Sequence, residues 1–347
     1  MVPVVGASGI VGRHDQAMVS GGGITIGRAG AMGVVTRVRE SFWPLNTTLF
    51  VTDFCGNNPD FVYYFLKDFD FTPYNSGGVQ PMLNRNYIKD VPVRIPSHAR
   101  QHAIAEVLGA LDDKISTNAR TAEMTADLAE ALYARDSRNR SGWSEVTLTD
   151  TAKWLSGGTP KTSEPSYWGG DIPWISAASL KSPWIDDSDR KVTRLGAENG
   201  TRLIPKGSIV FVVRGMSLTS EFRIGLTQRE VAFGQDCKAL LPAPGIAPET
   251  LFLALKSMTP EILGLVDAAG HGTGRLATDR ISKVRVRLPE GPTAANFSYA
   301  VVPLIEQACA MRRENRTLAE LRDTLLPQLV TGKIRVKVAE RLVEDAT

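Results

Sequence analysis

Apolar and polar residues alternate along two short stretches that lie far apart in the chain. IKDVPVRIP runs from Ile88 to Pro96, and ISKVRVRLP runs from Ile281 to Pro289. A period of two predicts a β-strand with one buried face. Because both stretches also close on a proline, we expect two equivalent strands, each of which leads the chain into the element that follows.

A different period begins after each of these prolines. Apolar residues then recur at spacings of three and four, first at Ile104, Val107, Leu108, Leu111, Ile115, Met124, Leu128 and Leu132, and later at Val301, Leu304, Ile305, Ala308, Met311, Leu318, Leu321 and Leu325. This spacing predicts two long amphipathic helices. Each apolar stripe is narrow, which favours packing against a single partner helix, and the simplest arrangement pairs the two helices antiparallel.

The two predicted helices also match in sequence, since NARTAEM at 118–124 aligns with NRTLAEL at 315–321. This places Asn118 over Asn315, where a polar pair can fix the register of two helices. The chain is therefore an internal duplication with an α+β fold, in which two mixed α/β domains are separated by two long antiparallel coiled-coil helices. The expected parts are a first domain at 1–96, a helix at 97–140, a second domain at 141–290, a helix at 291–335 and a tail at 336–347. The residues expected to pair the helices are Leu108, Leu111, Ile115, Asn118, Leu128, Ile305, Ala308, Asn315, Leu318 and Leu325.

Composition limits the classes of protein to which the chain could belong. Of its 347 residues 43% are hydrophobic and 22% are charged, with a net charge of +3, so any nucleic-acid binding depends on local placement of Arg and Lys. Three scattered cysteines argue against disulfides and against a thiolate metal site. No apolar stretch approaches membrane-spanning length, so we expect a soluble, cytoplasmic protein.

The order of several motifs resembles the specificity subunit of type I restriction–modification enzymes. The second half carries WLSGGTPKTSEPSYWGGDIPWIS (154–176), IPKGSIVFVVRG (204–215) and LLPQLVTGKI (325–334). The first half carries similar segments, namely PVVGASGIVGRHD (3–15), GGGITIGRAGAMGVV (21–35) and FWPLNTTLFV (42–51). The resemblance covers nearly the whole chain.

The resemblance implies a function for each part. Each domain would recognise one half of a bipartite, asymmetric site in double-stranded DNA, and the helices would set the gap between the halves. The helices would also dock two copies of the modification (methyltransferase) subunit, and through them the restriction subunit. The chain itself would have no catalysis and no cofactor, whereas S-adenosylmethionine, ATP and Mg would serve the partners. Two alternatives remain, a coiled-coil scaffold that joins only proteins and a DNA-processing enzyme.

One difference separates the halves. The second domain opens with Glu145 to Ile172, whereas Met1 falls roughly where Pro173 falls in the repeat, so the first domain has no counterpart of this opening. A start codon set too late, a truncated first domain and a replaced opening all explain the difference.

Side chains that could contact DNA are forked donors and amides on loops, because these can reach base edges in the major groove. Arg28 follows a predicted strand in the first domain, and Arg214 is its expected counterpart in the second. The full set of candidates is Arg28, Gln80, Asn84, Lys161, Thr162, Arg214, Gln235, His271, Thr273 and Arg275. His98 and His102 have helical spacing but lack a third ligand, and we expect no metal site.

Overall fold

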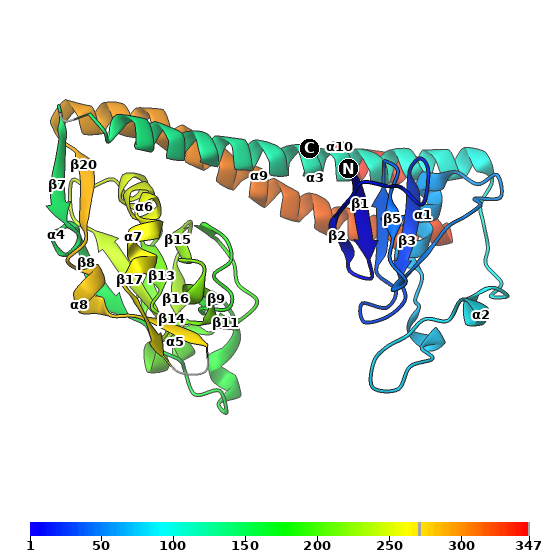
Figure 1. Cartoon of the computed structure of the whole chain (residues 1–347), viewed down its shortest axis with the longest axis horizontal. Helices are drawn as coiled ribbons and strands as arrows, with labels where there is room; N and C mark the ends of the chain where they lie inside the picture. Colours follow the sequence, from blue (N-terminus) through cyan, green and yellow to red (C-terminus); the bar gives the residue numbers. More distant parts are fainter. Residues whose placement is uncertain (140, 270–271, 346–347) are drawn as a thin grey trace. The chain divides into compact units, whose positions relative to one another are not determined.

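The computed structural model describes residues 1–139, 141–269 and 272–345, and these residues form two compact units. The first unit comprises Met1–Asn118 and Arg313–Thr347, and the second comprises Ala119–Arg312. Two long helices, α3 (His98–Asp136) and α9 (Gly291–Thr331), contribute to both units (Figure 1). Each unit therefore combines a mixed α/β domain with parts of both helices.

The second unit contains a five-stranded and a four-stranded sheet, with strand orders β10-β15-β13-β17-β8 and β11-β9-β16-β12. Two smaller sheets, β14-β19-β18 and β20-β7, complete it. Its strands are β7 (Trp143–Thr147), β8 (Ala152–Ser156), β9 (Trp168–Ile175), β10 (Trp184–Ile185), β11 (Lys191–Val192), β12 (Leu203–Ile204), β13 (Ile209–Val212), β14 (Arg214–Gly215), β15 (Ile224–Thr227), β16 (Val231–Phe233), β17 (Cys237–Pro242), β18 (Val266–Ala269), β19 (Thr273–Leu276) and β20 (Arg285–Pro289). Its short helices are α4 (Leu148–Thr151), α5 (Arg194–Gly200), α6 (Pro248–Ser257), α7 (Thr259–Gly264) and α8 (Thr278–Ile281).

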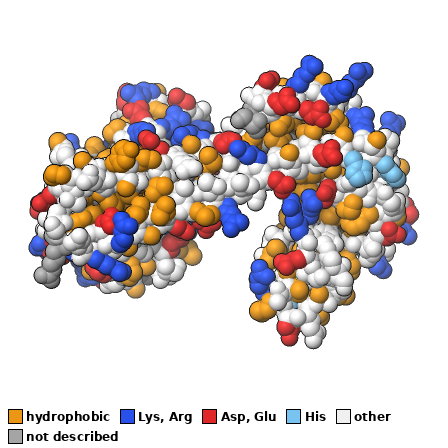
Figure 2. Space-filling model, turned by 90° about the horizontal axis from the view of Figure 1, so that it is seen from above, with side chains coloured by type: hydrophobic (Ala, Val, Ile, Leu, Met, Phe, Trp, Pro, Cys, Tyr) orange, Lys and Arg blue, Asp and Glu red, His pale blue; other side chains and the backbone are white. Residues whose placement is uncertain are grey.

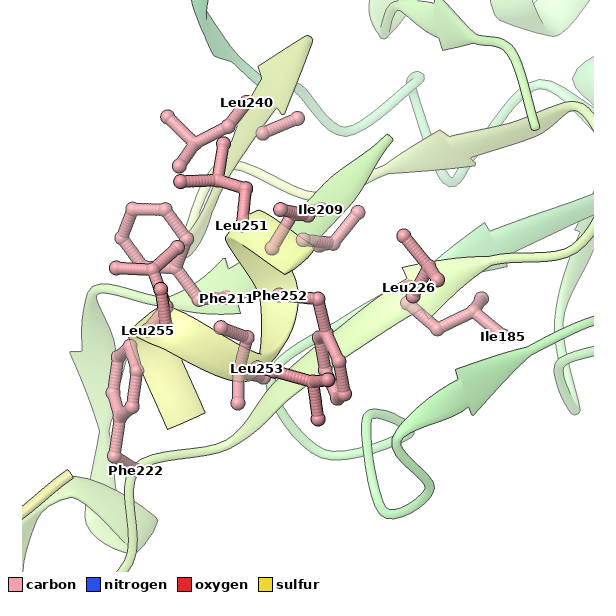
Figure 3. Close-up of a cluster of buried hydrophobic side chains, with 14 of the residues drawn as sticks. Ile185, Ile209, Phe211, Phe222, Leu226, Leu240, Leu251, Phe252, Leu253 and Leu255 are labelled. Carbon is pink, nitrogen blue, oxygen red and sulfur yellow. The ribbon is translucent and has the colours of Figure 1, made fainter. Parts of the chain in front are cut away.

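The core of the second unit lies between α6 and the five-stranded sheet. Every residue of β13 is buried, which explains its uninterrupted apolar sequence IVFV. Figure 3 shows Leu251 and Leu255 of α6 beside Phe211 and Leu240 of the sheet. This packed layer supports the loops at the strand ends.

The first unit repeats part of this architecture. Its sheets have the orders β2-β1-β5 and β4-β3-β6, and β1 pairs with β5 in parallel as β9 pairs with β16. The helix α1 begins at a proline, Pro59, as α6 begins at Pro248. The elements are β1 (Val2–Gly6), β2 (Gly9–His14), β3 (Gly23–Gly27), β4 (Val35–Val38), β5 (Trp43–Pro44), β6 (Thr48–Phe50), α1 (Pro59–Asp68), α2 (Arg85–Ile88) and α10 (Val336–Glu344). The duplication seen in the sequence is thus a duplication of topology.

The two stretches with alternating residues do not fold alike. The second begins at the last residue of α8 and ends in β20, which pairs with β7. The prediction of a strand at Ile88–Pro96 is wrong, because residues 91–97 adopt no regular structure and Val93 and Ile95 are 46% and 42% exposed. The physical reason is the missing partner, since no described segment of the first unit takes the place of β7 and a lone strand leaves its backbone groups unpaired.

In the first unit, α3 and α9 run antiparallel and pack through a leucine row. Asp112 lies 2.6 Å from Arg322 and Lys114 lies 3.2 Å from Glu314, so residue numbers rise along α3 while they fall along α9. The residues Leu108, Leu111, Leu318 and Leu325 are at most 1% exposed, Ile115 is partly buried, and Asn118 is 3% exposed. Asn315 is partly buried, and its Nδ2 donates to the Ile115 carbonyl at 2.9 Å.

In the second unit, the packed row on α3 differs from the expected one. Leu128 is 49% exposed and Met124 is 60% exposed, whereas Ala122, Ala129 and Tyr133 are buried. The buried row on α3 therefore consists of Ala122 and Ala129, seven residues apart, followed by Tyr133. The ring of Tyr133 packs near Trp143 and Phe297. On α9, Ile305 and Ala308 are buried in this cluster.

None of the helices in the described part of the chain has both the length and the hydropathy that crossing a membrane requires.

Candidate nucleic-acid interface

Two exposed arginines face each other where the sheet of the second unit ends. Arg214 of β14 lies directly opposite Arg275 of β19 in the antiparallel register. Backbone bonds hold this junction in place: the Asp236 carbonyl accepts from the N–H groups of Val213 and Arg214 at 2.8 and 3.3 Å, and Leu276 N–H donates to the Val213 carbonyl at 2.9 Å. The two guanidinium groups therefore project from a rigid backbone junction.

The junction borders an open cavity of about 410 Å³. Polar side chains line most of it, among them Arg214, Arg275, Gln235, Asp236 and Thr278. Gln235 is exposed and occupies the turn between β16 and β17, so three of the candidates proposed from sequence lie around one cavity. Asp267, which lies opposite Arg275 on β18, pairs with Arg280 at 2.8 Å.

A second loop of this unit carries Lys161 and Thr162, both exposed. Two glycines fix the base of the loop, because a Cβ on Gly157 would lie 2.3 Å from the Gly234 carbonyl oxygen and one on Gly158 would lie 2.3 Å from the Gly200 carbonyl oxygen. The Gly158 N–H donates to the Phe233 carbonyl at 3.0 Å. The loop is thus hydrogen-bonded to Phe233, the last residue of β16, two residues before Gln235.

The first unit contains the same junction with other side chains. The Thr47 carbonyl accepts from Arg28 and Ala29 N–H at 2.8 and 3.4 Å, and Leu83 N–H donates to the Arg28 carbonyl at 2.7 Å. Ala29 forms a bridge with Met82. These bonds equate Arg28 with Val213, Ala29 with Arg214, and Met82 with Arg275.

The expected equivalence of Arg28 and Arg214 is therefore wrong by one residue. Their sequence contexts IGR and VVR look alike, but the hydrogen-bond register shows that Arg28 is equivalent to Val213. The segment from Arg28 to Thr47 is also shorter than that from Val213 to Asp236, so matching of motifs alone does not fix the alignment. Arg28 itself is exposed, and its guanidinium has no partner among the described residues.

Gln80 and Asn84 flank the same junction. Gln80 is exposed, and a Cβ on Gly30 would lie 3.6 Å from its Nε2. The side chain of Asn84 accepts from Asn86 N–H at 3.0 Å and so caps α2. Asn84 therefore has a structural role that competes with DNA contact.

The remaining candidates lie near the tip of the β18–β19 hairpin. Thr273 begins β19 and is partly buried, whereas His271 lies outside the described residues. Sequence reasoning missed Ala29, Met82 and Asn46, which share their backbone positions with Arg214, Arg275 and Gln235. Their signal lies in the hydrogen-bond register and not in their chemistry, since neither Ala nor Met is a typical candidate for DNA contact.

Charge on the surface is mixed. Figure 2 shows basic and acidic side chains interspersed on the face drawn, in keeping with a net charge of +3. Within the described residues no three His, Cys, Asp or Glu side chains gather in a way that could hold a metal ion. The junction of the second unit is therefore a local group of donors in a chain whose net charge is small.

Comparisons with known proteins agree with this architecture. The family model described as type I restriction modification DNA specificity domain matches residues 1–125 and again residues 140–293. The chain is 28% identical over 240 residues to the specificity subunit of the type I restriction enzymes EcoR124I/EcoR124II of Escherichia coli. This match covers 66% of the chain and 59% of that relative. It is also 29% identical over 198 residues to the specificity subunit of the type I restriction enzyme HindI of Haemophilus influenzae. This second match covers 56% of the chain and 42% of that relative. The matches thus span less than two thirds of these relatives.

A solved structure shows the same fold. The S subunit of a type I restriction–modification system from M. genitalium superposes with a TM-score of 0.65 at 19% identity, over 95% of this chain and 88% of that one. The repeated family match coincides with the repeated topology, and it covers well over half of the sequence. The chain therefore belongs to the type I restriction–modification DNA specificity family.

Proposed function

We propose that the chain is the DNA sequence-recognition subunit of a type I restriction–modification complex and that each unit reads one half of a bipartite target. One observation carries the proposal: the same backbone junction occurs in both units but presents different side chains, Ala29 and Met82 in one and Arg214 and Arg275 in the other. A shared backbone junction that carries different side chains suits two domains that recognise different DNA sequences.

The chemistry of the junctions supports contact with a duplex. Arg, Gln and Asn present donors that match base edges in the major groove, and phosphate contacts add affinity that depends on salt. A net charge of +3 gives little non-specific attraction, so binding depends on a few placed groups. We expect affinity to rest mainly on assembly with partner subunits that bind DNA as well.

The long helices supply the scaffolding part of the proposal. On α3, Met124 and Leu128 are exposed one turn apart, and Tyr299 on α9 is 86% exposed. Large apolar side chains on the outer face of a helix suit a protein partner. We assign this face to the methyltransferase subunits, two copies per chain, through which the restriction subunit joins the complex. Adenine methylation with S-adenosylmethionine, and ATP- and Mg-dependent cleavage, then belong to these partners.

The experiment that tests the proposal is co-expression of the chain with a type I methyltransferase subunit, followed by mapping of methylated adenines. A bipartite motif that appears only when both proteins are present is the expected result. Methylation by the chain alone would favour an enzyme. Complex formation without any sequence-dependent methylation or DNA affinity at low salt would favour a scaffold that joins only proteins.

The exposed helix face is tested in the same system. Met124→Ser with Leu128→Ser should weaken co-purification of the methyltransferase subunit, whereas Leu195→Ser, an exposed leucine on α5, should not. Equal co-purification of all three proteins would place the scaffold face elsewhere.

A further inference from the structure

The pair of arginines in the second unit has an unusual electrostatic arrangement. Residues directly opposite in an antiparallel pair have Cβ atoms about 4.5–5.5 Å apart, and like charges in this position destabilise the sheet. Neither Arg214 nor Arg275 has a hydrogen bond or ion pair from its side chain to any described residue. Two guanidinium groups at one site, neither with a partner among the described residues, indicate a ligand rich in hydrogen-bond acceptors.

The neighbouring carboxylates leave the arginines available. Asp267 faces Arg275 from β18 but is paired with Arg280 at 2.8 Å. Asp236 lines the cavity without an ion pair among the described residues, and its carbonyl oxygen holds the backbone of the junction. The cavity thus carries two positive charges and one negative charge, together with the amide of Gln235.

A DNA duplex offers two acceptor-rich partners for an arginine, the phosphates and the O6 and N7 atoms of guanine. Phosphates are alike in every sequence, so a phosphate contact has the same task in both halves of a target. The equivalent positions in the first unit are instead Ala29 and Met82, which cannot donate a side-chain hydrogen bond. A change of this kind between repeats fits a contact to bases, which differ from one half-site to the other.

We infer that Arg214 and Arg275, with Gln235 beside them, read guanine in the half-site of the second unit, and that the first unit has no guanine reader at the equivalent position. The inference rests on the proposed function, because it assigns a base to one of the two half-sites. It also names the residues that set the choice. Arg275 lies on β19, the central strand of the sheet β14-β19-β18, so its backbone is flanked by a paired strand on each side.

The test compares methylation motifs of the complex reconstituted with wild-type chain and with the variants Arg275→Ala, Arg275→Lys and Arg214→Ala. The matched control is Arg202→Ala, which removes another exposed arginine of the same unit. For Arg275→Ala we expect discrimination at one guanine of one half-site to fall by about 5- to 150-fold, the range for one bidentate contact. Arg275→Lys keeps the charge but loses the fork, so it should relax the same position.

The outcomes separate this inference from the proposed function. An unchanged motif in all Arg214 and Arg275 variants, or a uniform loss of methylation at every site with a smaller salt dependence, would overturn guanine reading and indicate phosphate contacts or none. A wild-type complex without any bipartite motif would instead reject the proposed function. Thermal unfolding of each variant checks the fold, and because both side chains are exposed we expect no loss of stability.

Discussion

Arg322 on α9 donates to the carboxylate of Asp112 on α3 at 2.6 Å, and both side chains are mostly buried. The same carboxylate accepts from the hydroxyl of Tyr64 on α1 at 2.7 Å. Asp112 of α3 therefore links α1 and α9. Burial, the hydrogen bond to Asp112 and the charge of that carboxylate all raise the pKa of Tyr64, so its hydroxyl stays protonated and remains a donor.

Replacing Tyr64 by Phe should destabilise the first unit. The change leaves one oxygen of Asp112 without its donor, at a cost of about 1–3 kcal/mol for a hydrogen bond to a charged group. Urea unfolding measures the change. The control is Tyr63→Phe on the same helix, whose hydroxyl has no hydrogen-bond partner among the described residues. Equal unfolding free energies for the two variants would show that the bond to Asp112 contributes little.

Asn118 should lower the stability of the helix pair. It is 3% exposed, and its Nδ2 has no partner in the described structure. Asn118→Leu should therefore raise the free energy of unfolding by about 1 kcal/mol, because it removes a buried amide without a bond. If the asparagine also fixes register, the variant should unfold with a lower dependence on urea concentration.

The comparison for this change is Ser116→Leu, two residues earlier and exposed, which should alter stability much less. A clear loss of stability in Asn118→Leu alone would mean that the amide is fully bonded in solution.

The long helices were predictable because their signal is local. Apolar residues at spacings of three and four run along each helix. The matched Asn118 and Asn315 are buried and partly buried, respectively. Leu128 shows the limit of this reasoning, because exposure depends on which neighbour a face meets. Alanines at 122 and 129 allow a close approach that the hydrophobic pattern alone did not favour.

The strand at Ile88–Pro96 and the Arg28 equivalence failed for another reason. A strand requires a partner, and the alternating pattern carries no information on whether one is present. Likewise the identity of Ala29 and Met82 as counterparts of Arg214 and Arg275 depends on hydrogen bonds between distant segments. Non-local pairing decides both features, so the residue pattern alone could not reveal them.

Hydrogen exchange should distinguish the two alternating stretches. The amides of 91–95 pair with no strand, whereas those of β20 pair with β7. We expect amides at 91–95 to exchange at least about tenfold faster than amides of β20, because their opening costs little free energy. Exchange measured by mass spectrometry on the full chain checks this. Equal protection of both stretches would show that another segment covers 91–95 in solution.

The second unit should lose stability at alkaline pH through Tyr133. Burial raises the pKa of Tyr133 to about 12, and its hydroxyl donates to the Arg287 carbonyl at 2.8 Å. In the unfolded chain a tyrosine ionises near pH 10. Between about pH 10 and 12 the folded state keeps a proton that the unfolded state releases, so stability falls as pH rises, by about 2–3 kcal/mol over this window.

Urea unfolding from pH 8 to pH 11 tests this for the wild-type chain and Tyr133→Phe. The variant should be less stable at pH 8 but should lose less stability above pH 10. Tyr299→Phe is the control, because it removes the hydroxyl of a ring that is 86% exposed. Parallel pH curves for the wild-type chain and Tyr133→Phe would contradict the assignment.

Gly157 should be needed for the position of the loop that carries Lys161 and Thr162. Any side chain at Gly157 meets the carbonyl oxygens of Gly234 and Phe233, at 2.3 and 2.4 Å from a Cβ. These are backbone atoms of a buried turn and cannot move aside without distorting β16. Gly157→Ala should therefore cost about 1–3 kcal/mol in unfolding free energy and reduce DNA affinity of the reconstituted complex.

Gly109→Ala supplies the matched control for this loop, because it lies within α3 with nothing within 4 Å of its Cβ position and should stabilise the chain by about 0.5–1 kcal/mol. Both variants are measured by thermal unfolding and by DNA binding of the complex at two salt concentrations. If Gly157→Ala lowered stability but left affinity intact, the loop would serve the fold alone and Lys161 would lie outside the interface. Loss of both would place the loop at the DNA, because the displaced backbone carries Lys161 and Thr162 with it.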